Sequence, residues 1–257
     1  MDKIFFMVFF ILTLISCAEK KEISNYYDSG NIKSKGEFIN GEKVGWFYEY
    51  YENGNLKSKS FWKEGFLNGK GINYFENGQV SIISHWKNGQ QDGEAKEFSE
   101  IGRLTARSFY KDDKLVGDVF FYDVNGNLIE RQLYNNDGYL IYYSKFANNR
   151  KVDESILPFY KSKADTISLG ENYEVNICLG IKLEADVKIY LGELDAEAQL
   201  IDTIEIVESD DNVIFHYSEK PVSAGKNAIS GIFFHEENSI DSTSITGYSF
   251  KHGYYVK

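Results

Sequence analysis

Residues 50–69 read YYENGNLKSKSFWKEGFLNG, and this segment contains most of one copy of a motif that recurs every 24 residues. One glycine marks the same position in five copies: Gly30, Gly54, Gly78, Gly102 and Gly126. The five copies stay in register without any insertion or deletion. A repeat array stacks small units into one extended surface, because each unit is too small to bury a core alone. Such a surface favours binding over catalysis.

Aromatic side chains recur at two positions of each copy. The first column is Phe38, Trp62, Trp86, Tyr110 and Tyr134, and the second is Tyr26, Tyr50, Tyr74, Phe98, Tyr122 and Phe146. An aliphatic residue such as Leu56 follows each glycine, and it shares parity with Trp62. Residues of one parity point to one face of an extended strand. We therefore expect a sheet with one aromatic face.

Two glycine turns divide each copy. Asn53-Gly54 and its equivalents suit the positive φ angles of a type I′ hairpin turn. A second turn is expected at Glu64-Gly65. Each copy is thus predicted to be a β-hairpin, and five copies over residues 26–150 are predicted to stack into an elongated antiparallel sheet. Asp113 and Asp137 replace the glycine of the second turn in later copies, so we expect the array to end there.

This wording resembles the MORN repeat family. More closely, it resembles the bacterial variant known as the YwqK-family antitoxin component of toxin–antitoxin systems. The resemblance covers roughly residues 23–150 and rests on the YYENGNL and WKEGFLNG segments. It implies a fold of hairpin repeats and a protein-binding role.

The first 22 residues form a separate segment. Lys3 precedes an apolar run at residues 4–15, which is too short to cross a bilayer of ~30 Å as a helix and suits a secretory signal. The next residues, Leu14-Ile15-Ser16-Cys17, resemble a bacterial lipobox. The resemblance implies cleavage before Cys17 and acylation of its sulfur and amine. An incidental cysteine in a signal that is cleaved elsewhere is the alternative.

These features predict a lipoprotein of the bacterial cell envelope. The signal peptide would cover residues 1–16, and a charged tether would cover residues 17–25. Burial of acyl chains contributes ~0.8 kcal/mol per methylene, so several chains on Cys17 would hold the protein firmly to a membrane. We expect the protein to be anchored in the outer membrane. It could lie on either the periplasmic face or the surface face of that membrane.

The charge balance changes near residue 151. Residues 151–257 contain 9 Lys, no Arg and 19 Asp plus Glu, a net charge of −10, whereas the first 150 residues have a net charge of −1. Short alternating segments separated by turns predict an acidic, immunoglobulin-like β-sandwich over residues 161–257. A linker is expected at residues 151–160. Phosphate binding needs a basic face, so we expect no nucleic-acid partner.

Cys178 is the second of the two cysteines. If Cys17 is acylated, Cys178 has no partner for a disulfide within the chain. It lies in an alternating segment, residues 173–181, in which no neighbour would generate a thiolate. We interpret Cys178 as a partly buried thiol in a strand rather than a nucleophile.

Motifs for catalysis or metal binding are weak. His235-Glu236-Glu237 begins like a zinc-protease motif, but Ser239 stands where the second histidine is needed. The segment at residues 123–127 is similar to a calcium loop only in part, because Tyr134 occupies the position of the required glutamate. We predict no enzymatic activity, no cofactor and no metal.

The candidate partner-binding residues are Tyr51, Phe61, Phe75, His85 and Phe109. Most aromatic residues of the two columns are expected to pack against one another, because a single-layer array has little else with which to build a core. The five candidates would then form a partly apolar stripe on the other side, where a protein partner could bind.

We therefore predict a non-enzymatic lipoprotein whose repeat sheet mediates protein–protein interaction, as a scaffold or in an antitoxin-like manner. Glycan binding through stacked aromatic rings is an alternative, as is a hydrolase whose carboxylates cannot be picked out from sequence. The oligomeric state and the role of the C-terminal domain stay open.

Overall fold

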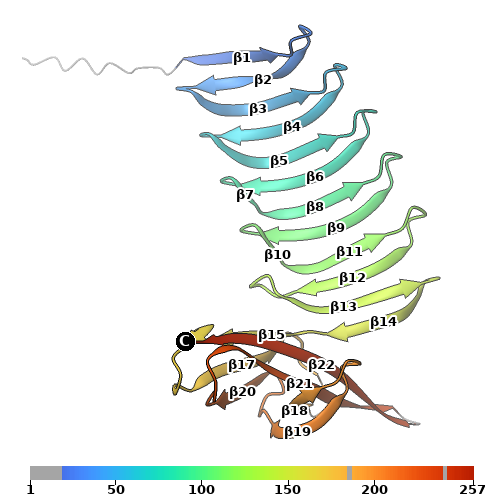
Figure 1. Ribbon diagram of the computed structural model, residues 1–257. Coiled ribbons are helices and arrows are strands. Elements are labelled where there is room, and N and C mark those ends of the chain that lie inside the picture. The colour runs from blue at the N-terminus through green and yellow to red at the C-terminus, as the bar shows by residue number, and fades with distance from the viewer. Residues whose placement is uncertain (1–18, 184–186, 240–241) are drawn as a thin grey trace, which may run out of the picture.

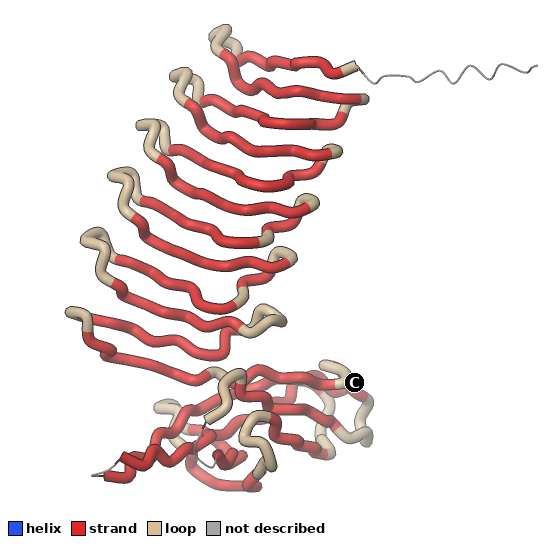
Figure 2. The backbone as a smooth tube through the Cα atoms, turned by 180° about the vertical axis from the view of Figure 1, so that it is seen from behind, coloured by secondary structure: helices blue, strands red, loops and turns tan. Residues whose placement is uncertain are grey.

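The computed structural model describes residues 19–183, 187–239 and 242–257. Its regular structure is entirely β, in 22 strands (Figure 2), which confirms the all-β prediction. Within the described residues there is no helix of the length and apolar character needed to cross a membrane. The predicted signal peptide at residues 1–16 and the predicted lipid attachment at Cys17 lie outside the described residues.

A long antiparallel sheet contains twelve strands that pair in chain order (Figure 1). They are β1 (Lys20–Tyr26), β2 (Ile32–Ile39), β3 (Glu42–Tyr50), β4 (Leu56–Lys63), β5 (Phe66–Tyr74), β6 (Val80–Lys87), β8 (Gly93–Phe98), β9 (Leu104–Lys111), β11 (Gly117–Tyr122), β12 (Leu128–Tyr134), β13 (Leu140–Ala147) and β14 (Arg150–Ile156). Two short strands, β7 (Gln90–Gln91) and β10 (Lys114–Leu115), pair with β6 and β9. The predicted elongated sheet of stacked hairpins is confirmed.

The turn at Asn53-Gly54 differs from the predicted type I′ turn. The Gly54 amide donates to the Tyr51 carbonyl at 2.9 Å, and the Tyr51 amide donates to the Asn55 carbonyl at 2.8 Å. Gly54 has a φ of 87°, whereas Asn53 has no positive φ. This pattern is a three-residue loop in which a type I turn is closed by a left-handed glycine. The type I′ assignment was wrong because this loop needs only one left-handed residue.

The two-residue turns lie at the opposite ends of the strands from the three-residue turns. Glu64 and Gly65 have φ values of 52° and 78°, as a type I′ turn requires. Asp112 and Asp113 keep the same conformation, with φ values of 49° and 66°, because aspartate tolerates the left-handed region better than most residues. The loss of glycine at Asp113 therefore does not end the array.

Strands extend beyond the predicted array at both ends. β1 begins within the segment expected to be a tether, residues 17–25, and β14 occupies much of the segment expected to be a linker, residues 151–160. β15 (Pro158–Ser162) starts two residues after β14 ends, with Leu157 between them. Residues 150–162 are therefore almost entirely strand rather than linker.

One face of the array, which we call the tryptophan–serine face, carries Phe47, Ser60, Trp62, Ser84 and Trp86. The indole nitrogens of Trp62 and Trp86 each donate to the serine two residues earlier, at 2.8 Å. Phe47 is buried and meets Trp62 edge-on, with ring centroids 6.4 Å apart. The tryptophans are only half-buried, so they pack on small neighbours more than on one another.

Two further sheets follow the array. One contains β15, β17 (Tyr173–Leu179) and β20 (Ile214–Glu219), and the other contains β16 (Thr166–Ile167), β22 (Ser242–Val256), β21 (Gly225–Ser239), β18 (Val187–Leu194) and β19 (Leu200–Val207), in those spatial orders. Ile177, Ile189, Phe215 and Phe233 are 0% exposed in their shared core. β17 lies beside β20, and β18, β21 and β22 are neighbours in the other sheet, as in an immunoglobulin-like sandwich.

The last hairpins of the array contact the sandwich directly. The Leu157 amide donates to the Ile141 carbonyl at 2.9 Å, and Tyr139 stacks on Phe159 with ring centroids 5.2 Å apart. Ile141 is 4% exposed, and it fills the space that a side chain on Gly180 would need. These contacts hold the sandwich against the end of the array. Figures 1 and 2 show from opposite sides that the sandwich lies next to the last strands of the array.

Candidate functional site

The face opposite the tryptophan–serine face carries the centre of the predicted stripe. Phe61 meets Trp46 edge-on, with ring centroids 5.4 Å apart, and the Lys59 ammonium lies 4.2 Å from the Trp46 ring centroid. The Arg107 guanidinium lies 5.1 Å from the Phe109 ring centroid. We call this surface the basic–aromatic face and define it by Lys35, Trp46, Tyr48, Lys59, Phe61, His85, Arg107, Phe109 and Arg131.

The repeat arranges this face into two parallel columns. The basic column contains Lys35, Lys59, Arg107 and Arg131, each in the same phase of the 24-residue period, and Ile83 takes the remaining position. The apolar column contains Phe61, His85, Phe109 and Leu133, two residues further along the same strands. Residues two apart in a strand share a face. A basic and an apolar side chain therefore lie side by side in β4, β9 and β12, whereas β2 has Lys35 next to Glu37 and β6 has Ile83 next to His85.

A glycine four residues after the two-residue turn makes room for the apolar column at Phe61 and His85. Gly69, with a φ of 96°, interrupts the pairing of β4 with β5 opposite Phe61. A β-carbon on Gly93 would lie 3.0 Å from the β-carbon of His85. A bulge of this kind re-aims nearby side chains and leaves one residue unpaired. The glycine spacing thus shapes the surface as well as the turns.

The basic column is compensated differently in its two halves. Among the described residues, Lys35 and Lys59 form no ion pair with a carboxylate, and Lys35 instead lies 5.9 Å from the Tyr48 ring centroid. Arg107 and Arg131, in contrast, each bind a carboxylate on the neighbouring strand at 2.7 Å. The two basic residues without an ion pair therefore lie in the N-terminal half, beside the half-buried rings of Trp46 and Tyr48 and the exposed ring of Phe61.

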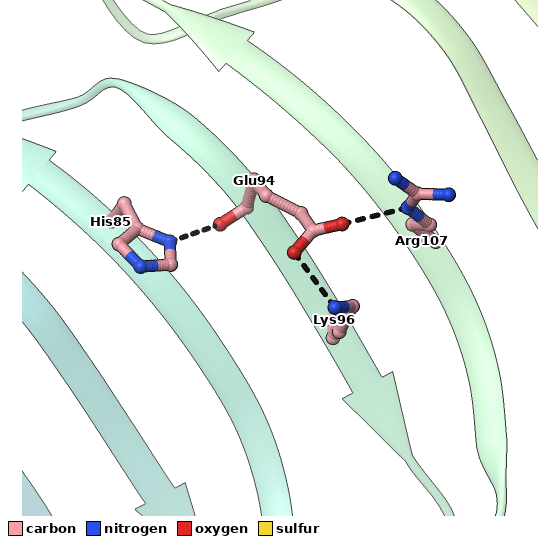
Figure 3. Close-up of polar contacts among 4 residues, drawn as sticks. All are labelled: His85, Glu94, Lys96 and Arg107. Carbon is pink, nitrogen blue, oxygen red and sulfur yellow. Dashed lines mark hydrogen bonds and ion pairs between the residues drawn. The ribbon is translucent and has the colours of Figure 1, made fainter.

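Glu94 in β8 joins three strands on this face (Figure 3). Its carboxylate accepts hydrogen bonds from Lys96 and Arg107, both at 2.7 Å, and its carbonyl lies 2.7 Å from His85 Nδ1. The hydrogen bond from Lys96 is the largest influence that lowers the pKa of the Glu94 carboxyl, and Arg107 acts in the same direction. Because a carbonyl only accepts, His85 Nδ1 carries a hydrogen and serves as a donor here.

The structure separates the five predicted site residues into two groups. Phe61, His85 and Phe109 lie together in the apolar column, with Phe61 37% exposed. Tyr51 and Phe75 instead lie at the start of three-residue turns, at the ends of the strands. The Tyr51 hydroxyl donates to the Tyr74 carbonyl of the next copy at 2.7 Å, so it has a structural role between copies.

Sequence reasoning missed Trp46 and the basic column. The signal for the column was present, because Lys35, Lys59, Arg107 and Arg131 recur at the same interval as the turn glycines. Trp46 has no aromatic equivalent 24 residues later, where Lys70 stands. Its importance depends on contacts with Lys59 and Phe61, which only the structure shows.

A hollow of about 290 Å³ lies beside Trp46 at the N-terminal end of the basic–aromatic face. Glycines form part of its lining, and two carboxylates from neighbouring strands lie at its side. The lining residues are Glu22, Lys35, Gly36, Glu37, Gly45, Trp46 and Tyr48. Lys20 pairs with Glu37 at 2.7 Å, so one carboxylate is already compensated.

Cys178 lies in a strand, as interpreted, and its thiol is buried rather than partly buried. Cys178 lies in β17 and is 4% exposed, and burial raises the pKa of its thiol. The Asp123 carboxylate accepts from the amides of Asn125 and Asn127 at 2.8 and 2.9 Å, which is the turn interpretation of that segment. Within the described part of the chain, no group of three His, Cys, Asp or Glu residues could hold a metal ion. The side chains of His235, Glu236 and Glu237 lie outside the described side chains.

A comparison with protein families agrees with the hairpin repeat. A family model described as a MORN repeat variant matches residues 21–40, 43–64 and 67–88, which correspond to the hairpins β1–β2, β3–β4 and β5–β6. A comparison with curated proteins finds no match. The later hairpins continue the same strand order and the same 24-residue phase through β12. From these repeats, the chain is a MORN-type repeat protein.

Proposed function

We propose that this MORN-type protein is a non-enzymatic, membrane-anchored lipoprotein whose basic–aromatic face binds a protein partner. The observation that carries the proposal is that this face has an exposed aromatic side chain and, in the described part of the chain, two lysines without an ion pair. Phe61 is 37% exposed, and Lys35 and Lys59 have aromatic neighbours but no carboxylate partner among the described residues. Exposed aromatic side chains with flanking charge are typical of partner-binding surfaces.

The lipobox resemblance supports anchoring through an acylated Cys17. β1 begins at Lys20, so the first strand of the array would lie directly beside the lipid. Neighbouring strands lie about 4.8 Å apart, so an array of twelve strands is roughly 50 Å long. The array would then act as a spacer that holds the acidic sandwich away from the membrane surface of the cell envelope, and the outer membrane is the membrane we favour.

The resemblance to YwqK-family repeats supports a narrower version of this function. In an antitoxin-like role, the bound partner would be a protein whose activity is blocked while its surface is covered. In a scaffold role, the same face would hold a partner that stays active. The two versions share the binding face and differ in what happens to the partner's activity on binding.

Glycan binding is the second candidate, and the hollow beside Trp46 favours it. Carbohydrate sites combine an aromatic wall with a few polar groups that fix the orientation of the ligand, and this hollow offers Trp46 and Tyr48 beside Glu22. The Lys59 ammonium already lies over the Trp46 ring, which reduces the area left for stacking. For this reason we place protein binding first.

Affinity capture from the native envelope tests the proposal. The full chain should retain one polypeptide, and the double variant Phe61→Ala/Phe109→Ala should lose it. A matched control is Tyr26→Ala/Ile101→Ala, which removes two exposed apolar side chains outside the basic column and the apolar column and should retain the partner. Equal retention by both variants would contradict the proposal. Retention on a polysaccharide column that free sugar reverses, and that Trp46→Ala abolishes, would support glycan binding instead.

A further inference from the structure

We infer that the partner segment held by the basic–aromatic face is acidic, extended and built on a three-residue period, and that it lies across the strands between the two columns. This inference rests on the proposed protein-binding function and specifies the chemistry of the partner. It follows from the charge of the face and from the spacing of its columns.

Charge selects an acidic segment. Lys35 and Lys59 form no ion pair with a carboxylate among the described residues, so each ammonium can receive an incoming carboxylate. Glu22 and Glu37 lie in the hollow beside Lys35, and Lys59 is therefore the stronger of the two sites. Further along the same column, Glu94 and Asp118 occupy Arg107 and Arg131 at 2.7 Å. These two pairs show that the column accepts carboxylates in this geometry. A basic segment would meet like charges at Lys35 and Lys59, where no carboxylate of the described residues is paired.

The column spacing selects a polyproline-II-like conformation. Equivalent residues of consecutive copies lie two strands apart, which is roughly 9.6 Å at the usual strand separation. A polyproline II helix has three residues per turn and rises about 9.3 Å per turn. Every third residue of such a segment would therefore meet the same position of the next copy. The mismatch over four copies is about 1 Å, which side-chain flexibility can absorb.

Other regular conformations fit the face less well. The two columns are two residues apart along the strands, a distance of about 7 Å, whereas an α-helix with its side chains is about 10 Å wide. A β-strand repeats its side chains every two residues, or about 6.6 Å, and would fall out of phase with the copies. The narrow extended helix is the conformation that can direct one set of side chains to each column.

The sandwich closes one end of this binding path. Tyr142, the strand partner of Leu133, is partly buried and packs against the core of the sandwich. The columns therefore end where the array meets the sandwich, while the β1 edge has no further strand among the described residues. The path from Lys35 to Arg131 spans four copies, which corresponds to a segment of about 12 residues.

Designed peptides test this inference on the full chain in detergent. The probe is a fluorescent peptide of about five Leu-Glu-Pro triplets, which favours polyproline II and repeats with the required period. The controls are a peptide of the same composition without the period and a peptide with Lys in place of Glu. Fluorescence anisotropy should show the probe binding about tenfold more tightly than either control, with an affinity that falls as salt is raised.

Matched variants locate the binding. Lys35→Gln/Lys59→Gln should weaken the probe about tenfold, whereas Lys145→Gln/Arg150→Gln, which removes two charges outside the basic and apolar columns, should leave it unchanged. Thermal unfolding shows whether each variant is folded, and the salt dependence of the unaltered chain gives a second measure that needs no variant. Equal binding of the probe and the aperiodic peptide would overturn the inference, as would column-dependent binding to phosphatidylglycerol vesicles with no binding to the probe. If envelope capture depends on the columns but the probe neither binds nor competes, the proposed function stands and this inference falls.

Discussion

The Lys59 ammonium lies 4.2 Å from the centroid of the Trp46 ring, on the neighbouring strand of the array. Phe61 meets the same ring edge-on, so one indole orders both a member of the basic column and a member of the apolar column. Aromatic pairs and cation–π contacts at exposed sites each contribute about 0.5–1.5 kcal/mol. Trp46 therefore links the charge of the candidate binding face to its apolar surface.

Replacement of Trp46 should weaken the first hairpins of the array. We expect Trp46→Ala to lower the free energy of unfolding by about 1–3 kcal/mol, because both ring contacts and the packing of the ring are lost. Trp46→Phe should lose less, since it keeps an aromatic partner for Phe61. Urea unfolding followed by circular dichroism measures the difference. Equal losses of stability for the two variants would show that an aromatic ring against Phe61 contributes nothing to the free energy of unfolding.

The left-handed conformation of Glu64 predicts a stabilising substitution. Glu64 has a φ of 52°, and glutamate is poorly suited to this region, whereas asparagine adopts it more readily. The equivalent turns already use Asn40 and Asn88. We expect Glu64→Asn to raise the free energy of unfolding by about 0.5–1 kcal/mol and Gly65→Ala to lower it. A melting temperature unchanged by Glu64→Asn would contradict the prediction, and Asn40→Glu should show the reverse effect.

The hydroxyl of Tyr51 should matter for stability and not for partner binding. It donates to the Tyr74 carbonyl of the next copy at 2.7 Å, and Tyr27 makes the same contact with Tyr50. A hydrogen bond of this kind contributes about 0.5–1.5 kcal/mol. Tyr51→Phe should therefore lower the melting temperature while envelope capture is retained. A variant that melts normally but loses the partner would place Tyr51 back in the binding face.

The fold could be predicted from this sequence largely because its repeat has no gaps. A fixed interval of 24 residues aligns the turn glycines, the aromatic residues and the basic residues in columns that can be counted along the chain. The turn types could not be read in the same way, because Asn-Gly fits both a type I′ turn and a type I turn closed by glycine. The contact of Ile141 with Gly180 could not be predicted either, since it joins two different folding units and leaves no local pattern.

The joint between array and sandwich should open when Gly180 gains a side chain. A β-carbon at Gly180 would lie 2.3 Å from Cγ2 of Ile141 and 2.4 Å from its β-carbon, too close for either to stay in place. Gly180→Ala should therefore separate the two parts and expose the backbone around Leu157 to proteases. Limited proteolysis and small-angle scattering would detect the change. Gly253→Ala in β22 is the control, because its backbone is not left-handed and a β-carbon there would lie 3.7 Å from the Asn227 carbonyl oxygen, an ordinary contact. Equal protease resistance in both variants would argue against a fixed joint.

The half-buried His252 of the sandwich should make the stability of this domain depend on pH. His252 stacks on Tyr160 with ring centroids 4.1 Å apart, and its Nε2 lies 2.8 Å from the Tyr173 hydroxyl. Burial lowers the pKa of His252 below its ordinary value of 6.5, although Asp165 acts in the opposite direction. Between the ordinary pKa of 6.5 and the lowered pKa of the folded state, the unfolded chain therefore binds a proton at His252 more readily than the folded chain does.

The sign of this effect follows from the lowered pKa of His252. Its contribution to stability is fully present above pH 6.5 and is lost as the pH falls from 6.5 through the lowered folded-state pKa. Thermal unfolding of the full chain between pH 7.5 and pH 5, roughly the range in which histidine titrates, should show the sandwich transition moving to lower temperature. His252→Phe, which keeps a ring against Tyr160 but cannot bind a proton, should flatten that dependence. An equally steep dependence in the variant would assign the effect to the acidic side chains of the sandwich.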